Sequence, residues 1–225
     1  MKQPNTAMNP TQRTVCTLLA AAALAAGLSA CAPLIVGGAV VGGVMATDRR
    51  TAGTQIEDEG IELRAANRIR ETLGERVHVN VTSYNRQALL TGEAPTEQDR
   101  QTVEKLVSQV ENVRSVVNDV AISTFSSTLS QRSNDTFITG KVRASLVDAQ
   151  DISVNSFKVV TERSIVYLMG RVSQREANRA TEIARGVSGV SKVVRVFEIV
   201  SEDELRRIAP QPAPVTTDNT KPSGG

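Results

Sequence analysis

The chain has few of the residues that usually build metal or redox centres. Its 225 residues include one histidine, two cysteines and no tryptophan. No pair of cysteines or histidines has the spacing of a zinc site, and no glycine-rich phosphate loop follows an expected strand. The histidine, His78, falls in an expected strand, where a solvated side chain is its ordinary role. We therefore expect no metal and no cofactor.

Patterns of a catalytic centre are equally scarce. The acidic run at residues 57–59 suits the start of a helix, where the helix dipole favours negative charge, better than a carboxylate pair around a substrate. No other arrangement of side chains looks catalytic, and a hydrolase has no supporting residues. The sequence therefore predicts a protein that is not an enzyme.

Long apolar runs are the third absence. A helix that spans a bilayer needs roughly 20 consecutive apolar residues. The glycine-rich apolar run at 32–46 has 15 residues. We interpret it as a flexible or interfacial spacer, with a buried helix as the alternative. A polar linker follows at 47–54.

The N-terminal segment has the layout of an export signal. Lys2 and Arg13 are the only charged residues before Asp48. An apolar run rich in leucine and alanine covers residues 15–28 and is followed by small residues. Charged start, apolar middle and small-residue exit are typical of a secretory signal, which is removed from the mature protein.

The residues that close this segment, Leu28-Ser29-Ala30-Cys31, resemble the lipobox of bacterial lipoproteins. In that class the residues before the cysteine are cut away and the cysteine is acylated. We therefore predict a signal peptide over residues 1–30 and lipidation of Cys31, with a plain secreted protein as the alternative. An anchor of several acyl chains holds a protein at a membrane almost permanently. Ala32, where an aspartate would favour the inner membrane, resembles the signal for the outer membrane, facing the periplasm.

Processing at this site changes the cysteine count and the charge. Cys16 would be lost with the signal and Cys31 would carry the anchor, so no disulfide is expected. The whole chain has 26 Lys and Arg against 24 Asp and Glu, and removal of Lys2 and Arg13 leaves 24 against 24. The basic isoelectric point is partly a property of the signal, and we expect no nucleic-acid partner.

The rest of the chain contains one unit twice. The apolar stripe of a helix recurs with an offset of 77, and a strand end with its glycine recurs with an offset of 78. The paired residues are Ile61, Ala65 and Ile69 with Ile138, Val142 and Leu146, and Leu90-Thr91-Gly92 with Leu168-Met169-Gly170. We place the first unit at 55–124 and the second at 133–200. Linkers are expected at 31–54 and 125–132, and a disordered proline-rich tail at 201–225.

Each unit has the same order of expected elements, which is helix, strand, strand, helix, strand. In the second unit, Ser133 or Asn134 is the expected N-cap of the first helix, with Asp135 in its first turn. A hairpin is expected to turn at Asn85-Arg86 in the first unit. The second helices are expected at 96–110 and 174–187, and the last strands at 115–122 and 192–200.

This order predicts an α+β fold of two tandem α-β-β-α-β units. A right-handed crossover gives each unit a small three-stranded mixed sheet packed on two helices. We interpret Gly92 and Gly170, which close the second strands, as structural residues that permit a positive φ or close backbone packing. Units of about 70 residues bury marginal cores, so we expect the two to pack against each other. A capping box at Ser201 predicts a short final helical turn.

The repeated unit resembles the BON domain. The markers are the positions of Gly92 and Gly170 and the motif Gly189-Val190-x-x-Val193. The segments most similar to dual BON-domain outer-membrane lipoproteins are 46–62, 133–143 and 167–177, and the resemblance covers residues 31–200. It implies a periplasmic lipoprotein that binds anionic phospholipids, supports outer-membrane integrity and concentrates at the division site. It also implies that an aromatic residue on the first helix of the second unit enters the bilayer, and Phe137 occupies that position.

Charge and periodicity favour the same helix. Residues 55–124 carry 8 basic and 12 acidic residues, a net charge of −4, whereas residues 132–200 carry 11 and 7, a net charge of +4. Phe137 lies about 100° from Ile138 around the helix, off the buried stripe. The expected lipid-binding residues are Phe137, Lys141, Arg143 and Arg132. The expected partner is an anionic, phosphatidylglycerol-like membrane.

Two alternatives stay open. In the first, Phe137 packs against the other unit and is not available to lipid. In the second, the opposite charges of the two units serve envelope protein partners or self-association. The protein would then be an interaction scaffold.

Overall fold

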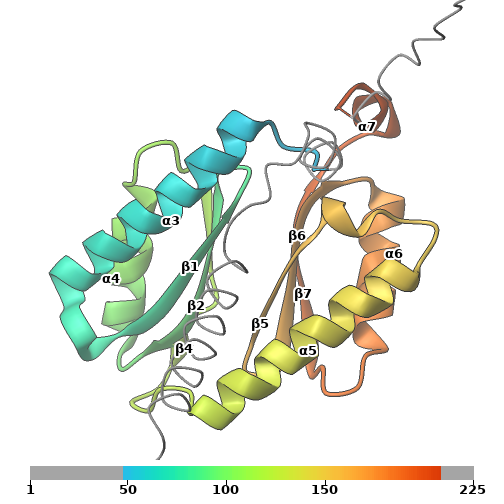
Figure 1. Ribbon diagram of the computed structural model, residues 1–225. Helices are drawn as coiled ribbons and strands as arrows, with labels where there is room; N and C mark the ends of the chain where they lie inside the picture. Colours follow the sequence, from blue (N-terminus) through green and yellow to red (C-terminus); the bar gives the residue numbers. More distant parts are fainter. Residues whose placement is uncertain (1–47, 209–225) are drawn as a thin grey trace, which may run out of the picture. The chain divides into compact units, whose positions relative to one another are not determined.

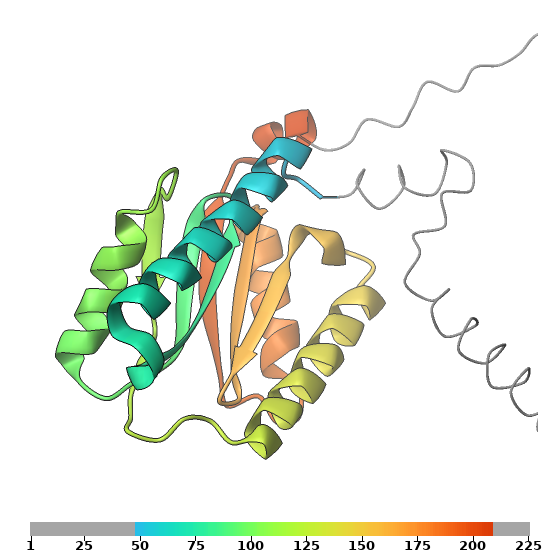
Figure 2. The same cartoon turned by 60° about the vertical axis from the view of Figure 1, so that its left-hand side comes forward.

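The computed structural model describes residues 48–208 of the chain. The expected signal segment, Cys31, the glycine-rich spacer and residues 209–225 of the expected tail lie outside this range. No helix among the described residues has the length and apolar character to cross a membrane. Two copies of the predicted order of elements fill the described part of the chain (Figures 1 and 2).

The first unit runs from α3 to β4. Its elements are α3 (Ala52–Leu73), a 3₁₀ turn (Gly74–Arg76), β1 (His78–Tyr84), β2 (Gln87–Ala94), α4 (Glu97–Ser108), β3 (Ser115–Asn118) and β4 (Ala121–Ile122). The second unit runs from α5 to β7. Its elements are α5 (Leu129–Asp148), a 3₁₀ turn (Val154–Ser156), β5 (Lys158–Glu162), β6 (Ile165–Val172), α6 (Gln174–Arg185) and β7 (Lys192–Ile199). A final helix, α7 (Glu202–Ile208), follows Ser201, whose Oγ accepts a hydrogen bond from Glu204 N at 3.1 Å.

Each sheet has the predicted mixed topology. β1 and β2 form an antiparallel hairpin, and β3 returns parallel to β2 after α4. β5, β6 and β7 repeat this arrangement around α6. The predicted α+β fold of two α-β-β-α-β units is therefore confirmed.

The last strand of the first unit departs from the prediction. A single strand was expected over 115–122, but β3 and β4 pair with β2 separately. The break follows Asn118, whose Nδ2 donates to Arg100 O at 3.1 Å and whose Oδ1 accepts from Val120 N at 3.2 Å. The expectation was wrong because this side chain takes over hydrogen bonds that a continuous ladder would make.

The helices of each unit cover one face of its sheet and enclose one hydrophobic core. The stripe predicted from the repeat lies in these cores and is at most 5% exposed. Its members are Ile61, Ala65 and Ile69 in the first core and Ile138, Val142 and Leu146 in the second. The repeat offset therefore reflects a repeated packing arrangement.

A third hydrophobic cluster joins the two units. It combines Tyr84 and Leu89 of the first unit with Tyr167, Met169 and Val196 of the second, and each of these is at most 4% exposed. Neighbouring residues along β2 and β6 alternate between this cluster and the helix-covered cores. The sheet faces that the helices leave open therefore pack on each other, as expected for units with small cores.

Gly92 and Gly170 lie where no side chain fits. Gly92 has a φ of 112°, and a Cβ there would lie 2.0 Å from the carbonyl oxygen of His78. A Cβ at Gly170 would lie 2.4 Å from the carbonyl oxygen of Ser156. Both distances are far below van der Waals contact, so these positions require glycine.

The start of α5 differs from the prediction. The helix begins at Leu129, because Thr128 caps it and forms a capping box with Gln131. The N-cap expected at Ser133 or Asn134 was therefore wrong by more than one turn. The interdomain segment is correspondingly shorter than the linker expected at 125–132.

Asp135 also has a different role from the one expected. It is buried in the second turn of α5, and its carboxylate accepts hydrogen bonds from Arg163 N and Ser164 N, both at 2.8 Å. These two residues form the tip of the β5–β6 hairpin and have positive φ values of 52° and 61°. Two-residue hairpin turns need such conformations, which usually select glycine or asparagine. The carboxylate compensates by binding both amide groups of the turn.

Asp58 repeats this contact in the first unit. Its carboxylate accepts hydrogen bonds from Asn85 N at 2.8 Å and Arg86 N at 2.7 Å. Because α3 begins at Ala52, after the N-cap Thr51, the acidic run at 57–59 lies beyond the first turn. The interpretation of this run as a helix start was therefore wrong, and its central residue holds the hairpin.

Candidate functional site

Helix α5 presents Phe137 to solvent. Ile138 and Val142 are fully buried and fix the helix on its sheet, whereas Phe137, about 100° round the helix from Ile138, is 65% exposed. The alternative in which Phe137 packs between the two units is therefore wrong. The ring is available to a partner outside the described chain.

Lys141 lies one turn after Phe137 and contacts it directly. Its Nζ lies 4.8 Å from the centroid of the Phe137 ring. Such a cation–π contact contributes roughly 0.5–1 kcal/mol at an exposed site. The same Nζ donates a hydrogen bond to the carbonyl oxygen of Ser188, in the loop after α6. Cation and aromatic ring thus occupy one place on the surface.

Arg132 and Arg143 lie at the other edge of α5. Each is exposed and lies about 120–140° round the helix from Phe137. The guanidinium of Arg132 contacts Nε2 of His78 in the first unit, and Arg143 lines a cavity of about 360 Å³. The structure therefore brings Phe137 and Lys141 together and places the two arginines across the outer face of the helix.

The outer face of α5 carries apolar residues that the sequence prediction missed. Leu129 and Val147, near its two ends, are 82% and 62% exposed, and Phe125, just before the helix, is 83% exposed. From residue 129 to residue 147 the helix contains a single acidic residue, Asp135, and it is buried. The outer face is uncharged or apolar along this length, with cations at both edges. The sequence contains a signal for this outer face, because Leu129 and Val147 occupy helix positions opposite the buried stripe.

Helix α3 of the first unit lacks this combination. Gly60 occupies the position equivalent to Phe137. Ile56 and Leu63 are exposed by 70% and 64%, but the exposed Glu59 lies between them. Apolar exposure is thus common to both first helices, whereas the aromatic residue with flanking cations belongs to the second unit.

Ion pairs attach the start of the described chain to the second unit. Arg49 donates to both carboxylate oxygens of Glu176 at 2.8 Å, and also to the carbonyl oxygen of Arg171 at 2.8 Å. The side chains of Arg49 and Glu176 are only 12% and 6% exposed. Burial alone would raise the pKa of Glu176, but the hydrogen bonds from Arg49 and from Ser173 N outweigh it and lower this pKa.

The next residue binds the first unit. The Arg50 guanidinium donates to Asp58 at 2.8 Å and lies 4.2 Å from the centroid of the Tyr84 ring. Burial opposes the charge of Arg50, but hydrogen bonds to Asp48 and Asp58 raise its pKa. Burial also raises the pKa of Tyr84, to about 12. Consecutive arginines thus contact both units.

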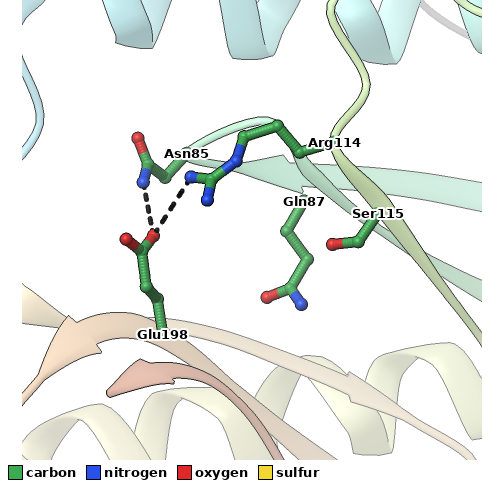
Figure 3. A pocket seen from close by; sticks show the side chains of 5 residues that line it. All are labelled: Asn85, Gln87, Arg114, Ser115 and Glu198. Atoms are coloured by element: carbon green, nitrogen blue, oxygen red, sulfur yellow. Dashed lines mark hydrogen bonds and ion pairs between the residues drawn. The ribbon is translucent and has the colours of Figure 1, made fainter. Parts of the chain in front are cut away.

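A small polar cavity of about 210 Å³ lies between the units (Figure 3). Its lining residues are Asn85, Gln87, Arg114 and Ser115 of the first unit and Glu198 of the second. Glu198 accepts a hydrogen bond from Asn85 Nδ2 at 2.5 Å and pairs with Arg114 at 3.6 Å. Because these groups pair with each other across the interface, we assign them to holding the units together.

Comparison with known proteins identifies the repeated unit. A family model described as the BON domain matches residues 58–124 and 134–201, once in each unit. The chain belongs to the BON domain family. It is 35% identical over 173 residues to the outer membrane lipoprotein DolP of Haemophilus influenzae, covering 76% of this chain and 89% of that protein. It is 34% identical over 155 residues to the 21 kDa hemolysin of Actinobacillus pleuropneumoniae, covering 68% and 79%.

Two further similarities are partial. Osmotically-inducible protein Y of Escherichia coli is 36% identical over 107 residues, which is 47% of this chain and 48% of that protein. The type III secretion protein CdsD of Chlamydia trachomatis covers 66% of this chain and 99% of its own solved structure, but its TM-score of 0.26 and 12% identity are too low to support an argument. The two BON matches and the similarity to DolP place the chain among dual BON-domain lipoproteins of the outer membrane.

Proposed function

We propose that the protein binds anionic phospholipid membranes through α5 of the second unit and so supports outer-membrane integrity, including at the division site. The observation that carries the proposal is the exposed Phe137 beside Lys141, on a helix whose one exposed acidic residue is its last, Asp148. Lys141 beside the ring, and Arg132 and Arg143 at the other edge, supply positive charge for lipid phosphates. Cys31 is the proposed acylated residue. The proposed function is binding and includes no catalytic step.

The expected affinity of this site alone is low. Burial of one phenylalanine side chain contributes about 1.5–3 kcal/mol, and each cation near an anionic surface contributes about 1 kcal/mol. A sum of about 5 kcal/mol corresponds to a dissociation constant on the order of 0.1 mM. Such a site is sufficient in an acylated protein, because the anchor raises its effective concentration at the bilayer.

Vesicle co-sedimentation tests the proposal. The fragment 43–225 lacks Cys31 and contains all three hydrophobic clusters, so it isolates the contribution of α5. We expect it to bind vesicles that contain phosphatidylglycerol but not neutral vesicles, and the binding should weaken with added salt. Phe137→Glu should abolish the binding while the circular dichroism spectrum stays unchanged.

The matched control is Leu63→Glu. It introduces the same charge at an equally exposed apolar position, 64% against 65%, on the first helix of the other unit. We expect this variant to bind like the unmodified fragment. Binding that does not depend on lipid charge, or that survives Phe137→Glu, would contradict the proposal.

A second candidate function is an interaction scaffold for envelope proteins. The exposed Ile56 and Leu63 of α3, in a unit with a net charge of −4, favour a protein partner over an anionic membrane at that helix. Crosslinking from α3 in intact cells tests it. Capture of one stoichiometric envelope protein would support the scaffold, and a diffuse set of products would count against it.

A further inference from the structure

A groove separates α5 from α6 in the second unit, next to Lys141. It is a shallow groove, largely open to solvent, with a volume of about 570 Å³. Ala144 and Ser145 line it from α5, and Ile183 and Val187 line it from α6 and the loop that follows. These side chains make its walls predominantly apolar.

The two ends of the groove differ in charge. Lys141 lies at one end, where its Nζ contacts the carbonyl oxygen of Ser188. Asp148 lies at the other end, seven residues or about 10 Å along α5. An anionic group is therefore favoured at the lysine end and disfavoured at the aspartate end. An amphiphile would therefore place its negative head at Lys141 and its apolar tail against Ala144, Ile183 and Val187.

The first unit shows what closes the same space. With the offset of 77, the counterpart of Ser145 is Arg68 and the counterpart of Lys141 is Arg64. Arg68 reaches from α3 to the carbonyl oxygen of Gln109 at 2.8 Å, at the end of α4. In the second unit the serine is too short to make this crossing. The same scaffold is thus bridged by an arginine in one unit and left open in the other.

A second difference between the units lies beside the lysine end of the groove. Gly189 has a φ of 98°, and a Cβ there would lie 3.2 Å from Ile138 Cγ1 and 3.6 Å from Lys141 Nζ. Its counterpart in the first unit is Asn112, which also has a positive φ and donates to Glu57 at 3.2 Å. A side chain at residue 189 would be strained by the positive φ and would press on the buried Ile138, whereas its contact with Lys141 would be an ordinary van der Waals contact.

We propose that the groove between α5 and α6 takes one acyl chain of an anionic phospholipid, whose phosphate lies at Lys141. This inference rests on the proposed membrane binding and gives it a specific site for a single lipid. Phe137, in contact with Lys141, would lie beside the phosphate at the mouth of the groove. The protein would then hold an individual lipid molecule as well as adhere to the bilayer surface.

The substitution Ser145→Arg separates this site from general electrostatic attraction. It reproduces the arginine of the first unit and fills the groove, but it also adds a positive charge to the cationic helix. Charge alone predicts binding to phosphatidylglycerol vesicles that is about fivefold tighter. The groove predicts binding that is weaker by at least about fivefold. The matched control is Ser133→Arg, which adds the same charge to the exposed surface of the same helix and should not weaken binding.

Parallel measurements separate failure of the groove from failure of the proposed function. Loss of binding in Phe137→Glu, with Ser145→Arg as tight as Ser133→Arg, would overturn the groove and leave membrane binding by α5 intact. Unchanged binding in Phe137→Glu would overturn both. All measurements use the fragment 43–225, and amide spectra check the fold of each variant.

A direct probe decides the matter where Ser145→Arg fails to fold. Methyl resonances of Ala144, Ile183 and Val187 are followed while short-chain phosphatidylglycerol is added below its aggregation concentration. We expect them to shift with this lipid and not with glycerophosphoglycerol, which has the same phosphodiester head and no acyl chain. Equal responses to both compounds, or shifts confined to Phe137 and its exposed neighbours, would overturn the groove.

Discussion

Replacement of Asp135 by alanine should destabilise the second unit. Asp135 lies on α5, but it stabilises the fold by binding the tip of the β5–β6 hairpin. The carboxylate accepts hydrogen bonds from Arg163 N and Ser164 N at 2.8 Å. Both turn residues have positive φ values without being glycine. Alanine removes both hydrogen bonds and leaves the unfavourable backbone conformations in place.

The magnitude follows from the exposure of the turn. A hydrogen bond to a charged group contributes about 1.5–3 kcal/mol when its loss leaves a buried partner. Arg163 is exposed and Ser164 is partly exposed, so water can reach both amide groups in the variant. The lower value therefore applies to each, and the free energy of unfolding should fall by about 3 kcal/mol. For the two-unit fragment 43–225, the melting temperature should fall by about 6–12 °C.

Urea denaturation of the fragment 43–225, followed by circular dichroism, measures this change. Asp148→Ala is the control, because it removes an exposed carboxylate from the last turn of the same helix. There it opposes the helix dipole, so its loss should be neutral or slightly stabilising. A second variant, with Ser164→Gly added to Asp135→Ala, should recover part of the loss, since glycine adopts a positive φ freely. An Asp135→Ala variant within about 0.5 kcal/mol of the unmodified fragment would refute this account of the turn.

Three further changes test other contacts. Arg49→Ala leaves the buried Glu176 without its ion-pair partner and should lower the free energy of unfolding by about 3 kcal/mol. Urea denaturation measures this change, and a value near zero would show that the pair is not formed. Gly92→Ala should lower the free energy of unfolding by about 3 kcal/mol or more, because the new Cβ meets a carbonyl oxygen, whereas Gly140→Ala, inside α5 with open space around it, should be neutral or stabilising by up to about 1 kcal/mol. Burial and nearby carboxylates raise the pKa of Glu162, so the folded state favours its protonated form and this contribution to stability is lost as pH rises through the raised pKa. Glu162→Gln should therefore raise the melting temperature at about pH 7 and have no effect at about pH 4, and a pH-independent difference would contradict this.

The internal repeat made the topology predictable. Each element was indicated twice, and the common offset fixed where the second copy of the stripe at Ile61 and the glycine at Gly92 must lie. The position of Phe137 off the buried stripe also followed from sequence, whereas its exposure was decided by the structure. In each case the information was local or was repeated along the chain.

Details that depend on tertiary contacts were not predictable in this way. The start of α5 is a different case: Thr128, Ser133 and Asn134 are all good N-caps, and the local capping box of Thr128 and Gln131 was a sequence signal that the prediction missed. Asp135 lies 77 residues after Asp58, which is the offset of the internal repeat. The sequence therefore indicated that the two aspartates are equivalent. The role of Asp135 nevertheless depends on the hairpin folding back onto the helix, which periodicity does not show.

The break between β3 and β4, which follows the side-chain hydrogen bonds of Asn118, also involves a contact with the second unit. Asp119 lies in the break, and its carboxylate accepts a hydrogen bond from the Tyr167 hydroxyl of the second unit at 2.7 Å. A sequence pattern within the first unit contains no information about this contact. The strand was therefore predicted as continuous because its own residues are compatible with a continuous strand.

The two units also act as controls for each other in assigning function. Residues that build the fold are shared between them, as the buried stripes, the turn-binding aspartates and the strand-closing glycines show. Two of the differences lie on the side of α5 that faces away from the buried stripe or toward α6, where Phe137 and Ser145 replace Gly60 and Arg68. Neither of these replacements is needed for the common core, since the first unit folds with the other residues. The fold does not require these differences, and they are grouped on one surface of the cationic unit. This pattern is expected when one copy of a duplicated domain has acquired a ligand.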